Sequence, residues 1–225
     1  MSVQELVTGV TGFLGSHVVH RLLEAGYNVR GAARSPKVAA AQQLYASYGA
    51  RYSVVPVDDL VSGDMSAALQ DVKAVIHVAA PLAGRTATAT ESLDIAIDGT
   101  LNVFRQAEKV GITNLVYVSS SSTMGDYASA PEVSDKLWFQ ITRAEAKKLT
   151  DGMTIYIAAK TLAEQSVWAF VDEHPHVEMT TVLPPFLYGP FAPGFVNTEG
   201  TRTALSTNAL LYNLLRPDGP IPPRP

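Results

Sequence analysis

Three glycines spaced three residues apart near the start of the chain constrain its fold more than any other feature. Residues 8–15 read T-G-V-T-G-F-L-G, follow a short apolar run and open a segment with helical spacing of apolar residues. Gly9 permits a tight turn, Gly12 lets the backbone approach a pyrophosphate, and Gly15 lets a helix pack close to the strand. The N-terminus of that helix would offer N–H groups and a partial positive charge to the anion. The loop therefore predicts a phosphate site between a first strand and a first helix.

After this loop the chain alternates short apolar runs with helical patterns. Strands are expected at residues 29–33, 51–57, 74–80 and 115–118, and helices at residues 38–48, 66–69 and 92–110. The continuous apolar run 74–80 is typical of a strand buried on both faces of a parallel sheet, and His77 within it is expected to be a hydrogen-bonded core histidine. Repeated units of this kind predict an α/β fold with a doubly wound parallel sheet, whose ligands lie beyond the carboxyl ends of the strands.

Composition limits the classes of partner. Apolar residues make up 47% of the chain and charged residues 17%, which is globular composition, and the net charge of −4 argues against binding nucleic acid through a basic surface. The absence of cysteine excludes disulfides and thiolate metal sites and fits a reducing compartment. Because the first residues lack the layout of a secretory signal and no apolar run reaches bilayer length, we expect a cytoplasmic protein with no membrane or metal partner.

The glycine loop and two later segments resemble a known family. Residues 8–15 match the pattern T-G-x-x-G-F-[IL]-G of the extended short-chain dehydrogenase/reductases, the NAD-dependent epimerase/dehydratase superfamily. Residues 156–164 and 183–191 resemble dihydroflavonol-reductase-like proteins and fungal NADPH-dependent aldehyde and ketone (methylglyoxal) reductases. The resemblance implies a Rossmann fold, with an NADP(H)-binding domain at residues 1–190 and a substrate-binding lobe that begins at 191–225 and is expected to be truncated.

The end of the second expected strand indicates which dinucleotide is bound. Between Tyr27 and Lys37 there is no Asp or Glu to bond an adenosine ribose hydroxyl, whereas Arg34 and Lys37 suit a 2′-phosphate. The segment therefore favours NADP(H) over NAD(H). The resemblance assigns an adenine contact to Asp59, which helix capping explains nearly as well. The further cofactor contacts that it implies are Gly9, Thr11, Gly12, Phe13, Leu14, Gly15, Leu60, Ala79, Ala80, Pro81, Tyr156, Lys160 and Pro184.

The reacting groups are expected after the fifth strand and on a later helix. Tyr156 and Lys160 are four residues apart on a helical pattern, so they share one helix face. The resemblance implies carbonyl reduction, with Tyr156 as the proton donor, Lys160 lowering its pKa from about 10 and a serine polarising the carbonyl. Alignment with the family pattern favours Ser121 as that serine, with Ser120 and Ser122 as rivals.

Three functions follow from these expectations. The favoured one is an NADPH-dependent reductase of a small aldehyde or ketone. A nucleotide-sugar epimerase or dehydratase of the same superfamily is the enzymatic alternative, which the missing acid after the second strand disfavours. A truncated, non-catalytic NADP(H)-binding protein is the third. The native substrate, the physiological direction and the oligomeric state stay open.

Overall fold

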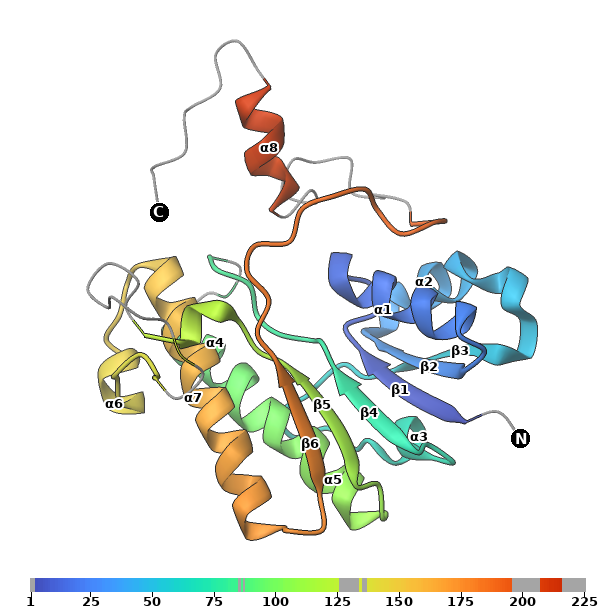
Figure 1. Cartoon of the computed structure of the whole chain (residues 1–225), viewed down its shortest axis with the longest axis horizontal. Helices are drawn as coiled ribbons and strands as arrows, with labels where there is room; N and C mark the ends of the chain where they lie inside the picture. Colours follow the sequence, from blue (N-terminus) through green and yellow to red (C-terminus); the bar gives the residue numbers. More distant parts are fainter. Residues whose placement is uncertain are drawn as a thin grey trace.

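The computed structural model describes residues 3–84, 86, 88–125, 134, 137–195 and 207–215 (Figure 1). Within them, six strands form one sheet in the order β3-β2-β1-β4-β5-β6, and every neighbouring pair is parallel. The strands are β1 (Gln4–Thr8), β2 (Asn28–Ala33), β3 (Tyr52–Pro56), β4 (Ala74–His77), β5 (Asn114–Val118) and β6 (Glu178–Val182). The strand order reverses between β1 and β4, so the predicted doubly wound parallel sheet is confirmed, and its crevice lies at these two strands.

Helices cover both faces of the sheet because its central strands are apolar on both sides. Leu6 of β1 belongs to the apolar core on the face of α5 and α7, whereas the adjacent Val7 belongs to the core under α1 and α2. Figure 1 shows these helices around the sheet. The helices are α1 (Phe13–Glu24), α2 (Val38–Leu44), α3 (Ser66–Leu69), α4 (Ala89–Leu93), α5 (Thr100–Lys109), α6 (Arg143–Ala146), α7 (Gly152–Glu173) and α8 (Asn208–Leu214).

Two of the expected helices differ from the prediction. The helix predicted at 38–48 ends at Leu44, and a 3₁₀ segment (η2, Ala46–Arg51) follows, in which Gly49 has a φ of 58°. The helix predicted at 92–110 is divided into α4, a π-helical segment (η3, Asp94–Gly99) and α5. Apolar periodicity identifies the helical character of such a stretch but does not distinguish a π turn from an α turn.

Strand β4 ends earlier than the apolar run predicts. Its pairing with β1 stops at the register Thr8↔His77, and the Thr8 hydroxyl oxygen then accepts hydrogen bonds from the N–H groups of Val78 and Ala79, both at 3.1 Å. The side chain thus replaces the main-chain partner that β1 cannot supply once the chain turns at Gly9. His77 is the core histidine expected from the sequence, because it is 1% exposed and hydrogen-bonds Thr8 (2.9 Å) and Thr100 (3.1 Å).

The chain beyond β6 leaves the sheet and carries α8, which Figure 1 shows apart from the strands. Asn208 attaches the start of α8 to Gly189 through two hydrogen bonds, of 2.9 and 3.0 Å. Of the lobe predicted at 191–225, residues 196–206 and 216–225 lie outside the described residues, so the domain division stays a prediction. Among the helices described, none is both long and apolar enough to cross a membrane.

Candidate active site

The glycine loop forms the tight turn that its spacing predicts. Gly9 has a φ of 70°, and the N–H of Gly12 donates to the Gly9 carbonyl at 3.0 Å. A Cβ on Gly15 would lie 2.1 Å from the Gly9 carbonyl oxygen, and a Cβ on Gly9 would lie 2.9 Å from the Ala79 backbone. The first turn of α1 therefore packs directly on the turn that precedes it, and this turn packs on the end of β4. Only a residue without a side chain fits at either glycine.

The N-terminus of α1 has the form of an anion site. Its N-cap residue is the exposed Gly12, which has no side chain to accept the first N–H groups of the helix. Thr11, Phe13 and Leu14 are half-buried around this end of the helix. The Phe13 ring lies 5.8 Å from that of Phe191, so the chain that follows β6 returns to the glycine loop.

The small residues after β4 lie between the glycine loop and α7. Ala79, Ala80 and Pro81 are all half-buried rather than packed away. Further along this segment, Gly84 abuts the start of α7, where a Cβ on Gly152 would lie 3.1 Å from the Gly84 nitrogen. The segment therefore runs from the predicted phosphate site toward the helix that carries Tyr156 and Lys160.

The end of β2 forms a hollow of about 400 Å³ lined by Arg34, Pro36, Lys37 and Asp58. Both cations that the sequence predicts for a 2′-phosphate are in its wall. Asp58, to which the sequence reasoning gave no role, accepts hydrogen bonds from the Ser35 hydroxyl and, at 2.7 Å, from the Ser35 N–H. These two bonds, and to a smaller extent the Arg34 charge, lower the pKa of Asp58. The lining of the hollow therefore combines two cations with a single carboxylate.

Asp59 has a local role in this structure. Its carboxylate accepts a hydrogen bond from the Val61 N–H at 2.8 Å and another from the Ser62 hydroxyl, and both bonds lower its pKa. The neighbouring Leu60 is held by its carbonyl, which accepts a hydrogen bond from Asn102 at 2.9 Å. Asp59 thus stabilises the turn after β3, a local role similar to the helix capping that the sequence offered as the alternative. Its contact with adenine stays a prediction.

Tyr156 and Lys160 lie one turn apart on α7, whose N-terminus is capped by Asp151. Burial raises the pKa of the Tyr156 hydroxyl, and a hydrogen bond with the Ser120 side chain opposes that increase. The sequence-based expectations that Lys160 lowers this pKa and that Ser121 is the polarising serine stay predictions. Ser120, named as a rival, hydrogen-bonds Tyr156 through its side chain, and the choice between Ser120 and Ser121 as the polarising serine stays open.

Lys160 is 4% exposed and points to the end of β5. Its Nζ donates a hydrogen bond of 2.8 Å to the Val118 carbonyl and lies 5.3 Å from the centre of the Tyr117 ring. Burial lowers the pKa of this ammonium group to about 8, although the nearby Glu164 opposes the decrease. The ammonium group of Lys160 is thus hydrogen-bonded to a main-chain carbonyl, and its expected effect on the Tyr156 pKa stays a prediction.

The serine segment is attached to β6 on one side and to α7 on the other. The N–H of Ser119 donates to the Val182 carbonyl at 2.8 Å, and that of Ser121 donates to the Pro184 carbonyl at 3.0 Å. Pro184 therefore lies beside the serines, and the cofactor contact that the sequence predicts for it stays a prediction. On the α7 side, the Ser119 hydroxyl donates to the Glu164 carboxylate at 2.6 Å. Sequence reasoning missed this contact; the spacing of four residues between Lys160 and Glu164 could have indicated only that Glu164 shares the helix face of Lys160.

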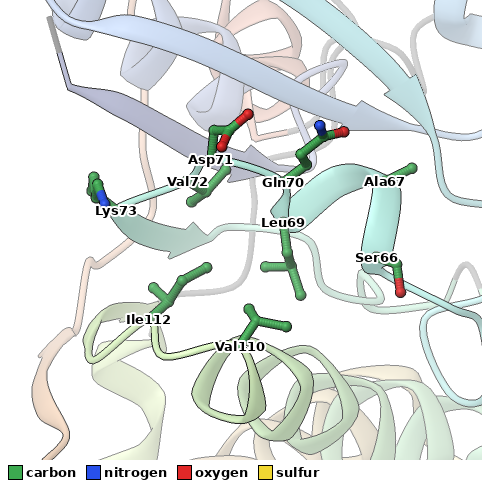
Figure 2. Close-up of a pocket in the computed structure, with 9 residues that line it drawn as sticks. All are labelled: Ser66, Ala67, Leu69, Gln70, Asp71, Val72, Lys73, Val110 and Ile112. Carbon is green, nitrogen blue, oxygen red and sulfur yellow. The ribbon is translucent and has the colours of Figure 1, made fainter. Parts of the chain in front are cut away.

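A second hollow, of about 560 Å³, lies near the amino end of β4, between α3, the start of that strand and the end of α5. Leu69, Val110 and Ile112 point toward one another within it (Figure 2). It contains none of the residues predicted for the site, and it lies at the amino ends of the strands, away from the crevice where parallel sheets bind ligands.

Comparisons with known proteins agree with this fold. The model of the NAD dependent epimerase/dehydratase family matches residues 5–212. Aldehyde reductase 2 of Sporidiobolus salmonicolor is 35% identical over 198 residues, which are 82% of this chain and 57% of that protein. Dihydroflavonol 4-reductase of Zea mays is 31% identical over 219 residues, which are 94% of this chain and 60% of that protein. The chain therefore spans about three fifths of the length of these two relatives.

Among solved structures, Gre2 of Candida albicans in complex with NADPH superposes with a TM-score of 0.83 at 25% identity. The match covers 98% of this chain and 68% of the Gre2 chain. The resemblance to dihydroflavonol-reductase-like and fungal aldehyde reductases, expected from residues 156–164 and 183–191, is confirmed.

Proposed function

This chain belongs to the NAD dependent epimerase/dehydratase family, and from that membership and the site we propose that it is an NADPH-dependent reductase of aldehyde or ketone carbonyls. The observation that carries the proposal is the group formed by Ser120, Tyr156 and Lys160 at the carboxyl end of β5. The names of two relatives, an aldehyde reductase and a dihydroflavonol 4-reductase, agree with this chemistry.

The residues of the loop and of the β2 hollow fit an NADP(H) molecule. The cradle between Gly9 and Gly15 leaves no room for a Cβ, and the N-terminus of α1 has no side-chain cap. These features suit a pyrophosphate, while Arg34 and Lys37 suit a 2′-phosphate. The NADPH complex of the Candida albicans neighbour supports the same choice of cofactor. When bound, the nicotinamide supplies the hydride for the carbonyl carbon.

Tyr156 is proposed to supply the proton. Because burial raises its pKa, the phenol keeps its proton at neutral pH and can donate it to the oxygen of a reduced carbonyl. The Ser120 hydroxyl, or that of Ser121, donates a hydrogen bond to the same oxygen and stabilises the negative charge that develops there. Lys160, with a pKa of about 8, is mainly an ammonium group at neutral pH and stabilises the phenolate left on Tyr156.

The proposal is tested by NADPH consumption with a panel of aldehydes, ketones and sugar nucleotides. We expect oxidation of NADPH with at least one class of aldehyde or ketone and none with sugar nucleotides. Tyr156→Phe should abolish turnover and retain NADPH affinity, because the phenol is the proton donor and not a phosphate ligand. Ser120→Ala should reduce kcat by about 10²-fold, and Ser121→Ala by less. Full activity in Tyr156→Phe would contradict the proposal.

A further inference from the structure

Glu164 is a buried carboxylate on α7, one turn beyond Lys160, and its exposed fraction is 2%. It accepts hydrogen bonds from the Ser119 hydroxyl at 2.6 Å and from the Thr123 hydroxyl at 2.8 Å, both at the same oxygen, Oε2. Ser119 is the first residue after β5, and Thr123 ends the 3₁₀ turn η4 (Ser121–Thr123). The two donors therefore bracket the serines from which the polarising hydroxyl comes.

We propose that Glu164 is a positioning residue, whose carboxylate fixes the serine segment on α7 so that the Ser120 hydroxyl meets that of Tyr156. This inference rests on the proposed reductase function. The Thr123 hydroxyl links Glu164 directly to the proposed site, since it also lies 2.9 Å from the Ser120 carbonyl oxygen. Tyr156 and Glu164 lie on the same rigid helix, so a segment anchored to one has a defined position relative to the other.

A buried carboxylate is unfavourable unless hydrogen bonds and an opposite charge compensate for its lost hydration. Burial of an ionised group requires hydrogen bonds and a nearby opposite charge, and an apolar side chain would pack there at lower cost. Glu164 obtains its hydrogen bonds from Ser119 and Thr123, and the opposite charge comes from Lys160. Both donors belong to the serine segment, so the carboxylate is satisfied only when that segment has the observed position.

The other groups that face this pair contribute little charge. His77 of β4 has its pKa lowered to about 3 by burial, so it is neutral at pH 7. Tyr117 of β5 has its pKa raised by burial and by Glu164, so its phenol keeps its proton. Tyr156 of α7 is likewise protonated. The acids of the π-helical segment packed against α7, Asp94 and Asp98, pair with Arg143 instead.

The variant Glu164→Gln retains the size of the side chain and one oxygen acceptor but loses the charge. A neutral amide oxygen can still accept both hydrogen bonds but holds the Ser119 and Thr123 hydroxyls more weakly than a carboxylate does, so the serine segment is less firmly positioned. We therefore expect kcat with the best aldehyde of the panel to fall about tenfold or more, while KM and NADPH affinity change less than about twofold. Since the Glu164 charge supports protonation of Lys160, the alkaline limb of the kcat–pH profile should move to lower pH. Glu173→Gln is the matched control, because it removes the same charge from the exposed end of α7 and should change neither quantity.

Glu164→Asp tests the same point if the glutamine variant does not fold. Its carboxylate is shorter by one methylene, so kcat should fall while the alkaline limb stays at the wild-type pH. A wild-type kcat in either folded variant, or a lower kcat in Glu164→Gln without movement of the alkaline limb, would overturn the positioning role. Full activity of Glu164→Gln beside an inactive Tyr156→Phe overturns only this inference. An inactive wild-type protein, or an active Tyr156→Phe, overturns the reductase function itself.

Discussion

Gly15→Ala is expected to separate the packing role of the glycine loop from its binding role. The added Cβ would lie 2.1 Å from the Gly9 carbonyl oxygen, 2.8 Å from the Gly9 carbonyl carbon and 3.1 Å from the Val10 Cα. All three are backbone atoms, so none can rotate away as a side chain would. Ordinary contacts begin near 3.4 Å, and the turn between β1 and α1 must therefore move by more than an ångström.

The expected cost follows from two opposing effects. Overpacking of a rigid site costs about 1–3 kcal/mol, and contact with backbone places this case near the upper value. Alanine stabilises a helix position by about 1 kcal/mol relative to glycine, and Gly15 is the third residue of α1. The free energy of unfolding should therefore decrease by about 2 kcal/mol, which for a chain of this length lowers Tm by roughly 4–8 °C. NADPH affinity should fall as well, because the displaced turn is the proposed pyrophosphate site.

Gly12→Ala is the matched control in the same loop. Gly12 has a φ of −90°, and the nearest atom to an added Cβ is the Gly9 carbonyl oxygen at 3.3 Å. We expect the free energy of unfolding to change by less than about 1 kcal/mol, while the exposed methyl group weakens NADPH binding by obstructing the approach of the pyrophosphate. Urea unfolding and fluorescence titration with NADPH measure the two quantities. The reasoning is refuted if Gly15→Ala is as stable as the wild type, or if Gly12→Ala is equally destabilised.

Two further predictions concern charge. Arg34→Ala should weaken NADPH binding by roughly tenfold or more, since a charge-assisted hydrogen bond contributes about 1.5–3 kcal/mol. The same variant should leave NADH affinity nearly unchanged. Equal losses of affinity for both dinucleotides in titration would exclude a 2′-phosphate contact. The pKa of His77 is lowered to about 3 in the fold, so the contribution of the neutral imidazole to stability is complete above about pH 6.5. Unfolding experiments should therefore detect a decrease of about 2 kcal/mol in the free energy of unfolding as the pH falls to 5. His77→Asn should lack this part of the pH dependence, and an identical pH dependence in both proteins would contradict the buried neutral state.

Local features were predictable because they depend on short stretches of chain. The turn at Gly9, the close packing at Gly15 and the shared helix face of Tyr156 and Lys160 follow from residue type and spacing alone. The alternation of strand and helix patterns likewise predicted the parallel sheet, since a strand buried on both faces has a recognisable apolar run. Helix boundaries were less accurate, as the π-helical segment Asp94–Gly99 illustrates.

The contacts between distant segments were decided only by tertiary structure. Four adjacent serines are nearly equivalent in sequence, and the strand direction at the end of β5 determines that Ser120 meets Tyr156 while Ser119 meets Glu164. Asp58 similarly enters the Arg34 hollow because β3 pairs with β2 in the register Val29↔Tyr52. Periodicity along the chain determines which face a residue occupies, whereas its partner across the fold depends on how two elements are aligned, and no local pattern contains that information.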